Sequence, residues 1–200
     1  MFIMLRGTAA VSIAKNGTGV RVGVMRQGDC FGEISLLTGE PRSATVRAES
    51  DCEVLEISKP VMAEVLRRTG TRHAIVLYGH DGLDELTTTT TSTLLDVSAD
   101  GVREMVVDPV ELGLAAAERE DLLGGDVDRN VAIAKEVLDG QGGPARDMVL
   151  LNTAAALVAA DAALSLPDGL EAAARSIDEG RARATLDAWV ESSRRAAADV

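Results

Sequence analysis

Glu33 and Arg42 are the two side chains whose types and spacing most clearly suggest ligand chemistry. They lie in the run Phe31–Val46, whose sequence is FGEISLLTGEPRSATV. A glutamate can accept hydrogen bonds from sugar hydroxyls, and an arginine can make a two-pronged, charge-assisted contact with phosphate oxygens. A short helix beginning near Gly32 would direct its free N–H groups at the same anion. The run therefore predicts a site for a ligand with both a sugar and a phosphate; the alternative is a hairpin loop with a surface ion pair.

The same run resembles the phosphate-binding cassette of cyclic-nucleotide-binding domains. The resemblance depends on the spacing from Glu33 to Arg42 and on the closing sequence Arg-Ser-Ala-Thr-Val. It implies that Gly32 and Glu33 hold the ribose, and that Arg42 pairs with the cyclic phosphate with help from backbone N–H groups. A hydroxyl at Ser43 is compatible with guanine as well as adenine, so cyclic AMP and cyclic GMP both remain candidate ligands. The implied ligand-binding set is Gly32, Glu33, Arg42, Ser43, Ala44 and Thr45.

Adjacent carboxylates at Asp84 and Glu85 form a second candidate site. They end a glycine-flanked segment, residues 79–85, that follows a short apolar run at residues 74–78. Mg²⁺ is commonly held by one or two carboxylates with waters and substrate phosphates, so the pair is a candidate site for a hard cation. The alternatives are solvated surface acids or a helix-start cap. His80 in this segment is a candidate general base, but we interpret it as a loop residue because no partner for it is visible.

Composition and charge exclude some classes of partner. The 200 residues carry a net charge of −12, and only 2% of them are aromatic, so the core must be aliphatic. Residues 1–68 contain 9 Lys and Arg against 8 Asp and Glu, whereas residues 69–200 contain 11 against 24. A duplex-binding protein needs a basic face, so we exclude nucleic acid as a partner. The charge asymmetry indicates two units of different origin.

The lack of a recognisable targeting signal and the cysteine usage both predict a cytoplasmic protein. No apolar run reaches the roughly 18 residues that a membrane helix needs, because Asn152 and Asp161 interrupt the best candidate. The first cation, Arg6, follows the apolar start rather than preceding it, which is not typical of a signal peptide. Cys30 and Cys52 lack metal-ligand spacing, so we interpret them as free thiols. We therefore expect a cytoplasmic protein with no membrane partner.

Residues 1–68 have the pattern of a β-rich module. Valines at positions 20, 22 and 24 alternate with other residues, which is the period-two signature of a half-buried strand. Strand–turn repetition of this kind predicts a β-roll or sandwich. Compared with the family that it resembles, the chain begins inside the third strand and leaves the pattern soon after Arg68. We therefore expect a partial, jelly-roll-like β-roll with open sheet edges. The other predicted elements are strands at residues 1–5, 10–13, 44–48 and 53–57, and a short helix from Pro60 to Arg68.

Residues 69–200 change to a mixed and then a helical pattern. The threonine run at residues 87–91 is expected to form a loop or a strand edge. Asp108 before Pro109 is a helix-start signal. The fold class that we predict is α+β, a partial β-roll followed by a truncated α/β domain with C-terminal helices. The predicted elements are strands at residues 74–78, 94–97 and 102–107, and helices over 128–138, from Pro144 to about 160, from Pro167 to about 180, and around Trp189.

The order of motifs in residues 69–200 resembles the C-terminal part of anthranilate phosphoribosyltransferase. That family transfers a phosphoribosyl group from phosphoribosyl pyrophosphate (PRPP) to anthranilate in tryptophan biosynthesis. The resemblance implies a glycosyltransferase-class enzyme with PRPP and anthranilate as small-molecule partners. It also implies that Asp84 and Glu85 bind Mg²⁺, which neutralises the leaving pyrophosphate. The matching stretches, in chain order, are residues 73–85, 108–114, 123–130, 142–152 and 170–186.

We interpret the chain as two incomplete modules, residues 1–68 and 69–200. The glycine-rich PRPP loop of the transferase is expected to be missing, since Gly124-Gly125-Asp126 matches a later motif of the family. The first hypothesis is thus a transferase-derived chain that is inactive alone, with no catalytic residue assigned. The alternative is a cyclic-nucleotide-binding regulatory module attached to an α/β partner domain. A third hypothesis is a chimera without an evolved function, which would form homo-oligomers or aggregates through its open sheet edges.

Overall fold

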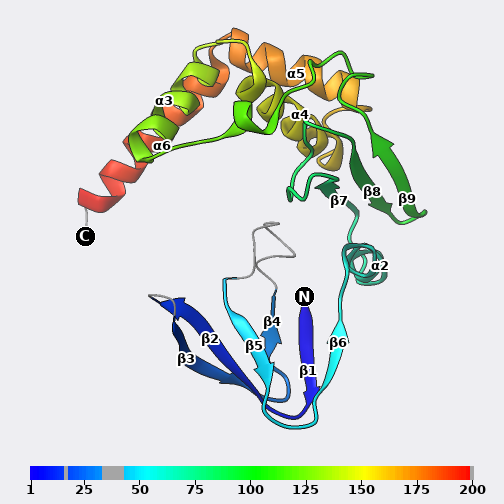
Figure 1. The fold of residues 1–200 in the computed structure, drawn as a ribbon. Helices are drawn as coiled ribbons and strands as arrows, with labels where there is room; N and C mark the ends of the chain where they lie inside the picture. The colour runs from blue at the N-terminus through cyan, green and yellow to red at the C-terminus, as the bar shows by residue number, and fades with distance from the viewer. Residues whose placement is uncertain (16–17, 33–42, 199–200) are drawn as a thin grey trace. The chain divides into compact units, whose positions relative to one another are not determined.

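A computed structural model describes residues 1–15, 18–32 and 43–198 of the protein (Figure 1). The chain divides into two compact units. The first comprises Met1–Glu85 with Thr93–Met105, and the second comprises Leu86–Ser92 with Val106–Val200. Small sheets and helices occur together, so the predicted mixed α+β class is confirmed.

Two antiparallel, three-stranded sheets form the start of the chain. Their strand orders are β4-β1-β6 and β3-β2-β5, so β1 and β2 are the central strands. Each central strand carries a buried residue, Met4 on β1 and Ala9 on β2. The strands predicted for residues 1–68 are all present, and the short β4 is an addition. Their bounds are β1 (Phe2–Arg6), β2 (Ala9–Lys15), β3 (Thr18–Met25), β4 (Cys30–Phe31), β5 (Thr45–Ala48) and β6 (Glu53–Glu56).

A helix and a third sheet follow. Helix α2 (Lys59–Arg68) has Pro60 in its first turn, as predicted, because proline lacks the N–H that this position would leave unpaired. The sheet has the order β7-β8-β9. Ala63 of α2 is buried in a cluster with Leu95 and Val97 of β8, which fixes the helix against this sheet. The strand bounds are β7 (His73–Gly79), β8 (Ser92–Ser98) and β9 (Gly101–Val107), so the predicted β8–β9 hairpin is confirmed.

The second unit is mainly helical. Helices α4 and α5 approach so closely that a Cβ atom on Gly169 would lie 2.8 Å from the Cα of Ala154. A buried aliphatic cluster links α3, α4 and α5, and consists of Val137, Leu150, Ala173 and Ile177. The helices predicted over residues 128–138, 144–160 and 167–180 and around Trp189 are confirmed, with small differences at their ends. The bounds are η1 (Arg119–Leu122, a 3-10 helix that was not predicted), α3 (Val127–Leu138), α4 (Pro144–Ala159), α5 (Leu166–Asp178) and α6 (Arg181–Ala198).

The segment after β9 is not the helix that Asp108 and Pro109 predicted. The Oδ1 atom of Asp108 accepts a hydrogen bond from the N–H of Val110 at 2.9 Å. The N–H of Leu114 donates to the carbonyl of Pro109 at 3.0 Å, and Gly113 has a φ of +83°. The aspartate therefore closes a local turn instead of starting a helix, which is a common alternative use of this side chain.

The threonine run forms a loop, as expected, but the loop is buried. Thr87 is 0% and Thr88 is 1% exposed. The hydroxyl of Ser92 accepts from the N–H of Thr87 at 3.1 Å, and Thr87 Oγ1 accepts from the N–H of Thr89 at 3.1 Å. The carbonyl of Thr88 accepts from Ala117 N–H at 3.1 Å, whereas the buried Thr88 Oγ1 has no hydrogen-bond partner among the residues that the structure describes. This loop is therefore part of the core rather than a solvated connection.

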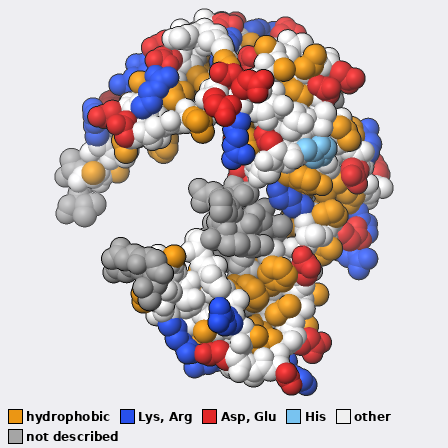
Figure 2. Space-filling model, in the orientation of Figure 1, with side chains coloured by type: hydrophobic (Ala, Val, Ile, Leu, Met, Phe, Trp, Pro, Cys, Tyr) orange, Lys and Arg blue, Asp and Glu red, His pale blue; other side chains and the backbone are white. Residues whose placement is uncertain are grey.

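The helices carry a mixed surface charge. Figure 2 shows acidic and basic side chains interspersed over them on the face that is drawn. Over the described ranges, no helix is both long enough and apolar enough to cross a membrane. Cys30 and Cys52 are exposed free cysteines, in agreement with their prediction as free thiols.

Candidate functional site

The structure describes the cyclic-nucleotide cassette only in part. Gly32 directly follows β4 and has a φ of +72°, and residues 43–44 lead into β5. Glu33 and Arg42, the predicted ribose and phosphate ligands, lie outside the described residues. Their roles therefore stay predictions. Of the other predicted members, Ser43 and Thr45 are exposed, while Gly32 and Ala44 are half-buried.

The start of the cassette is held by aromatic stacking. The rings of Phe2 on β1 and Phe31 on β4 have centroids 5.3 Å apart and an interplanar angle of 23°. The same two residues are paired in the antiparallel register of β1 and β4. Because Phe31 precedes Gly32, this contact positions the first residue of the predicted ribose-binding set.

Asp84 and Glu85 lie on a tight loop that follows β7. The N–H of Gly79 donates to the carbonyl of Leu83 at 2.9 Å, and the N–H of Gly82 donates to the carbonyl of Gly79 at 3.2 Å. Gly82 has a φ of +96°, a conformation that glycine adopts without strain. The structure thus keeps the two predicted metal ligands together, at the end of a loop whose shape is defined by backbone hydrogen bonds.

Negative charge is concentrated on this loop. Partial desolvation raises the pKa of Glu85, and the neighbouring charges of Asp84 and Asp81 raise it further. Asp84 is half-buried and Glu85 is exposed, so solvent reaches the pair even though the surrounding chain partly desolvates it. Like charges at close range destabilise each other, and a bound cation would relieve this repulsion.

The donor set fits a hydrated magnesium ion rather than a site made only of protein ligands. Among the residues that the structure describes, no group of three or more His, Cys, Asp or Glu side chains is arranged to hold a metal. Mg²⁺ does not require such a group, because it commonly binds one or two carboxylates and completes its octahedron with water and substrate phosphates. Asp84 and Glu85 supply hard oxygen donors of this kind.

Lys59 is a neighbour of the acidic loop that the sequence interpretation missed. Its Nζ atom lies 4.8 Å from the centre of the Tyr78 ring and 3.5 Å from the carbonyl oxygen of Leu77. Burial lowers the pKa of Lys59, and the charge of Asp84 opposes this shift. Only the packing of α2 against the β7–β8 part of the sheet brings the lysine here, so no local sequence signal could reveal it.

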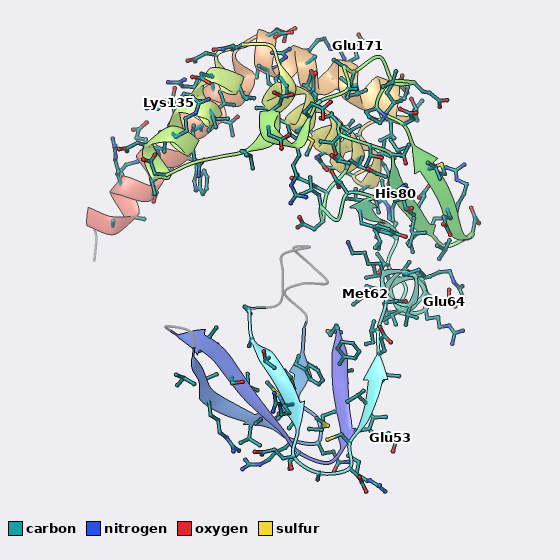
Figure 3. All side chains as sticks on the ribbon, in the orientation of Figure 1. Glu53, Met62, Glu64, His80, Lys135 and Glu171 are labelled. Carbon is teal, nitrogen blue, oxygen red and sulfur yellow. The ribbon has the colours of Figure 1, made fainter. Side chains whose placement is uncertain are left out.

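His80 has a hydrogen-bond partner. Its Nε2 atom lies 2.8 Å from Oγ1 of Thr93, a buried residue of β8. His80 is labelled in Figure 3 and belongs to the turn that follows β7, so its prediction as a loop residue is confirmed. The expectation that it lacks a partner is wrong, because strand pairing brings a threonine from another part of the sequence beside it.

The segment Gly124-Gly125-Asp126 starts helix α3. The Oδ1 atom of Asp126 caps the helix by accepting from the N–H of Arg129 at 2.9 Å. The side chain of Asn130 bonds both backbone groups of Gly125, accepting from its N–H at 2.9 Å and donating to its carbonyl at 3.2 Å. This segment is therefore explained by its structural role at the start of a helix, as its sequence position predicts.

Sequence comparison identifies relatives of most of the chain. Anthranilate phosphoribosyltransferase from Thermobifida fusca is 51% identical over 138 residues, which are 66% of this chain and 39% of that protein. The enzyme from Pelobacter propionicus is 43% identical over 143 residues, which are 70% of this chain and 41% of that protein. The chain thus spans about two fifths of the length of these curated relatives.

Solved structures give a consistent result. Anthranilate phosphoribosyltransferase from Thermus thermophilus matches with a TM-score of 0.60 and 33% identity, over 66% of this chain and 39% of that one. The Saccharomyces cerevisiae enzyme in complex with PRPP and Mg matches with a TM-score of 0.60 over 67% of this chain and 39% of that one, at 23% identity. The second likeness shows a shared fold.

Family models together match residues 1–183, and the two predicted resemblances are confirmed. A model of the cyclic nucleotide-binding domain matches residues 1–69, and a model described as "Glycosyl transferase family, a/b domain" matches residues 54–183. The two matches share residues 54–69, a range that includes helix α2. The second match covers well over half of the 200 residues. The chain therefore belongs to the glycosyl transferase family, a/b domain, and bears a cyclic nucleotide-binding domain match at its N-terminus.

Proposed function

We propose that this chain binds Mg²⁺ through Asp84 and Glu85, and that it binds the diphosphate of PRPP through this ion. The observation that carries the proposal is the pair of adjacent carboxylates on a loop fixed by backbone hydrogen bonds, with like charges that raise the pKa of Glu85. The relatives are anthranilate phosphoribosyltransferases, and one related structure contains PRPP and Mg. When bound, the ion would supply charge neutralisation for a leaving pyrophosphate. The two side chains would hold it, and the turn would orient them.

We infer further that the chain is a fusion of two incomplete modules, residues 1–68 and 69–200, and that it does not complete phosphoribosyl transfer to anthranilate by itself. Three observations support this proposal. The chain spans about two fifths of its curated relatives, the two family matches overlap only at residues 54–69, and net negative charge is confined to the second part.

Calorimetric titration with PRPP tests the proposed cation and substrate binding. We expect binding that requires Mg²⁺ and that Asp84→Asn abolishes. Asp100→Asn removes the same charge from the turn between β8 and β9, and should leave binding unchanged. Binding that persists without a divalent cation, or in Asp84→Asn, would contradict the assignment.

Turnover is tested separately through the fluorescence of anthranilate. With PRPP and Mg²⁺ present, we expect no loss of this fluorescence over the time in which a full-length relative consumes its substrate. Clear turnover that Asp84→Ala abolishes would show an active transferase and would overturn the inference of inactivity.

The second candidate function is the binding of a cyclic nucleotide, cyclic AMP or cyclic GMP. It is favoured by the family match over residues 1–69 and by Gly32, which takes a left-handed conformation directly after β4. Calorimetry with both nucleotides should give binding that Arg42→Ala abolishes, because the phosphate would lose its charge partner. Arg26→Ala, which removes an exposed arginine before β4, is the control. No heat with either nucleotide would remove this candidate.

A chimera without an evolved function makes a different prediction for the same titrations. Neither PRPP nor a cyclic nucleotide would then bind. Each sheet of the described residues has two outer strands, and such strands can pair with another chain. We therefore propose that light scattering will detect homo-oligomers of the purified chain; a strictly monomeric species would contradict association through these edges.

A further inference from the structure

Lys59 places a positive charge beside the acidic loop at a position where a helix does not favour one. It is the first residue of α2, and the free N–H groups of a helix give its N-terminus a partial positive charge. The ammonium is stabilised by the face of the Tyr78 ring, at 4.8 Å, and by the carbonyl of Leu77, at 3.5 Å. The N–H of Gly79, which follows Tyr78, donates to the carbonyl of Leu83 at 2.9 Å, so the residue before Asp84 lies beside the strand end that contacts the lysine. The charge of Asp84 is the third favourable interaction.

The position of this ammonium is defined by packing. Ala63 lies one turn further along α2, is 0% exposed, and packs with Leu95 and Val97 of β8. The same helix contacts β7, where the carbonyl of Leu77 and the ring of Tyr78 contact the Lys59 ammonium. The Lys59 side chain is already positioned by this packing, so little of its conformational entropy is lost when a ligand binds. Its positive charge therefore acts on the acidic loop from a constant position.

We propose that Lys59 is the resident counter-cation of Asp84, and that it selects a metal–diphosphate complex over the free metal ion. The inference rests on the cation site proposed above. A nearby positive charge repels a free divalent cation, so it weakens the binding of Mn²⁺ or Mg²⁺ alone. A magnesium–pyrophosphate complex carries net negative charge, so the same ammonium favours its binding. One residue therefore shifts the two affinities in opposite directions.

The test compares two probes across five variants of the full chain. Free Mn²⁺ is titrated by electron paramagnetic resonance, and inorganic pyrophosphate is titrated by calorimetry at saturating Mg²⁺. Lys59→Gln should bind free Mn²⁺ roughly three- to tenfold more tightly and the magnesium–pyrophosphate complex more weakly by a similar factor. Lys59→Arg keeps the charge and should behave like the unmodified chain. Lys135→Gln removes the same charge from the last turn of α3 and should change neither affinity.

The outcomes separate this inference from the cation site on which it rests. The proposal is supported if Lys59→Gln shifts the affinities for free Mn²⁺ and for magnesium–pyrophosphate in opposite directions, and if these shifts are lost when Asp84→Asn is added. If Asp84→Asn abolishes Mn²⁺ binding but Lys59→Gln leaves both affinities unchanged, or moves both in the same direction, the role of Lys59 is overturned and the cation site stands. If no variant binds Mn²⁺, the cation site is overturned and the role of Lys59 with it. Far-ultraviolet circular dichroism of each variant verifies that α2 is retained.

Discussion

Asn152 of α4 hydrogen-bonds both backbone groups of Leu86, the residue that directly follows Glu85. Its Oδ1 atom accepts from the N–H of Leu86 at 2.9 Å, and its Nδ2 atom donates to the carbonyl of Leu86 at 2.8 Å. The same Nδ2 atom donates to the carbonyl of Met148 at 3.0 Å. Leu86 is 0% exposed, so water cannot replace these bonds. The side-chain amide of Asn152 therefore pairs both backbone groups of Leu86, the first buried residue after the acidic loop.

Replacing this amide should destabilise the chain strongly. Asn152→Ala leaves two buried backbone groups without partners, and we expect a loss of about 2–4 kcal/mol in the free energy of unfolding. Urea denaturation followed by circular dichroism measures the loss. Asn130→Ala removes the equivalent two bonds to Gly125 at an exposed position and should cost less than about 1 kcal/mol. Equal losses in the two variants would contradict the importance of burial.

Gly169→Ala should disturb the contact between α4 and α5. The new methyl group would lie 2.9 Å from both the Cβ atom and the carbonyl oxygen of Ala154, so one helix must shift. We expect a destabilisation of about 1–3 kcal/mol, typical of overpacking, in thermal denaturation. Gly142→Ala is the matched control, since a Cβ atom there would meet nothing within 4 Å. A Gly169→Ala variant as stable as this control would show that the two helices separate easily.

Neighbouring threonines should respond differently to the same substitution. Thr88→Val removes a buried hydroxyl that has no partner in the described part of the chain, so stability should stay the same or rise by up to about 1 kcal/mol. Thr87→Val removes an acceptor for the N–H of Thr89 and should cost about 1–2 kcal/mol. The comparison needs only the two denaturation midpoints. A large loss in Thr88→Val would indicate that its hydroxyl is paired in solution.

Glu64 makes one part of the stability depend on pH. It is labelled on α2 in Figure 3, and its carboxylate accepts from Arg67 Nε at 2.8 Å and Arg68 Nε at 2.7 Å. These hydrogen bonds lower the pKa of Glu64 to about 2 from an ordinary value of 4.5. The stabilisation is therefore present above pH 4.5 and is lost as the pH falls towards 2. Glu64→Gln should slightly lower the Tm at pH 7 but not at pH 2; a pH-independent difference would contradict this linkage.

Glu85 should have the opposite pH dependence. Its raised pKa means that the folded chain holds the proton more tightly than the unfolded chain, so stability falls as the pH rises through the interval above 4.5. Glu85→Gln should accordingly have a higher Tm than the unmodified chain at pH 7, and an equal Tm below about pH 4. Added Mg²⁺ should raise the Tm of the unmodified chain more than that of the variant. A variant that is less stable at pH 7 would contradict this assignment.

Sequence patterns predicted the elements that depend on local chemistry. Valine alternation identified β3, and Pro144 identified the start of α4, because each signal acts within one or two turns of chain. The adjacent acids of the candidate site were visible for the same reason. At Asp108 the local signal was present, but a turn used the aspartate instead.

Contacts between distant segments were beyond sequence reasoning. The partner of His80 lies on β8, and the position of Lys59 depends on the packing of α2 against β7. The burial of Thr88 reverses what a polar run suggests, since only the surrounding core decides it. The roles of Glu33 and Arg42 stay predictions, because both lie outside the described residues.

Leu86 leaves the ribosome 66 residues before Asn152, the residue that bonds its backbone. At about 5–20 residues per second, this interval lasts about 3–13 s. During translation the backbone N–H and carbonyl of Leu86 therefore hydrogen-bond to water until the Asn152 amide has been synthesised. Pausing the ribosome within α4 would prolong this vulnerable period, and a nascent chain arrested there should be cleaved by protease near Leu86.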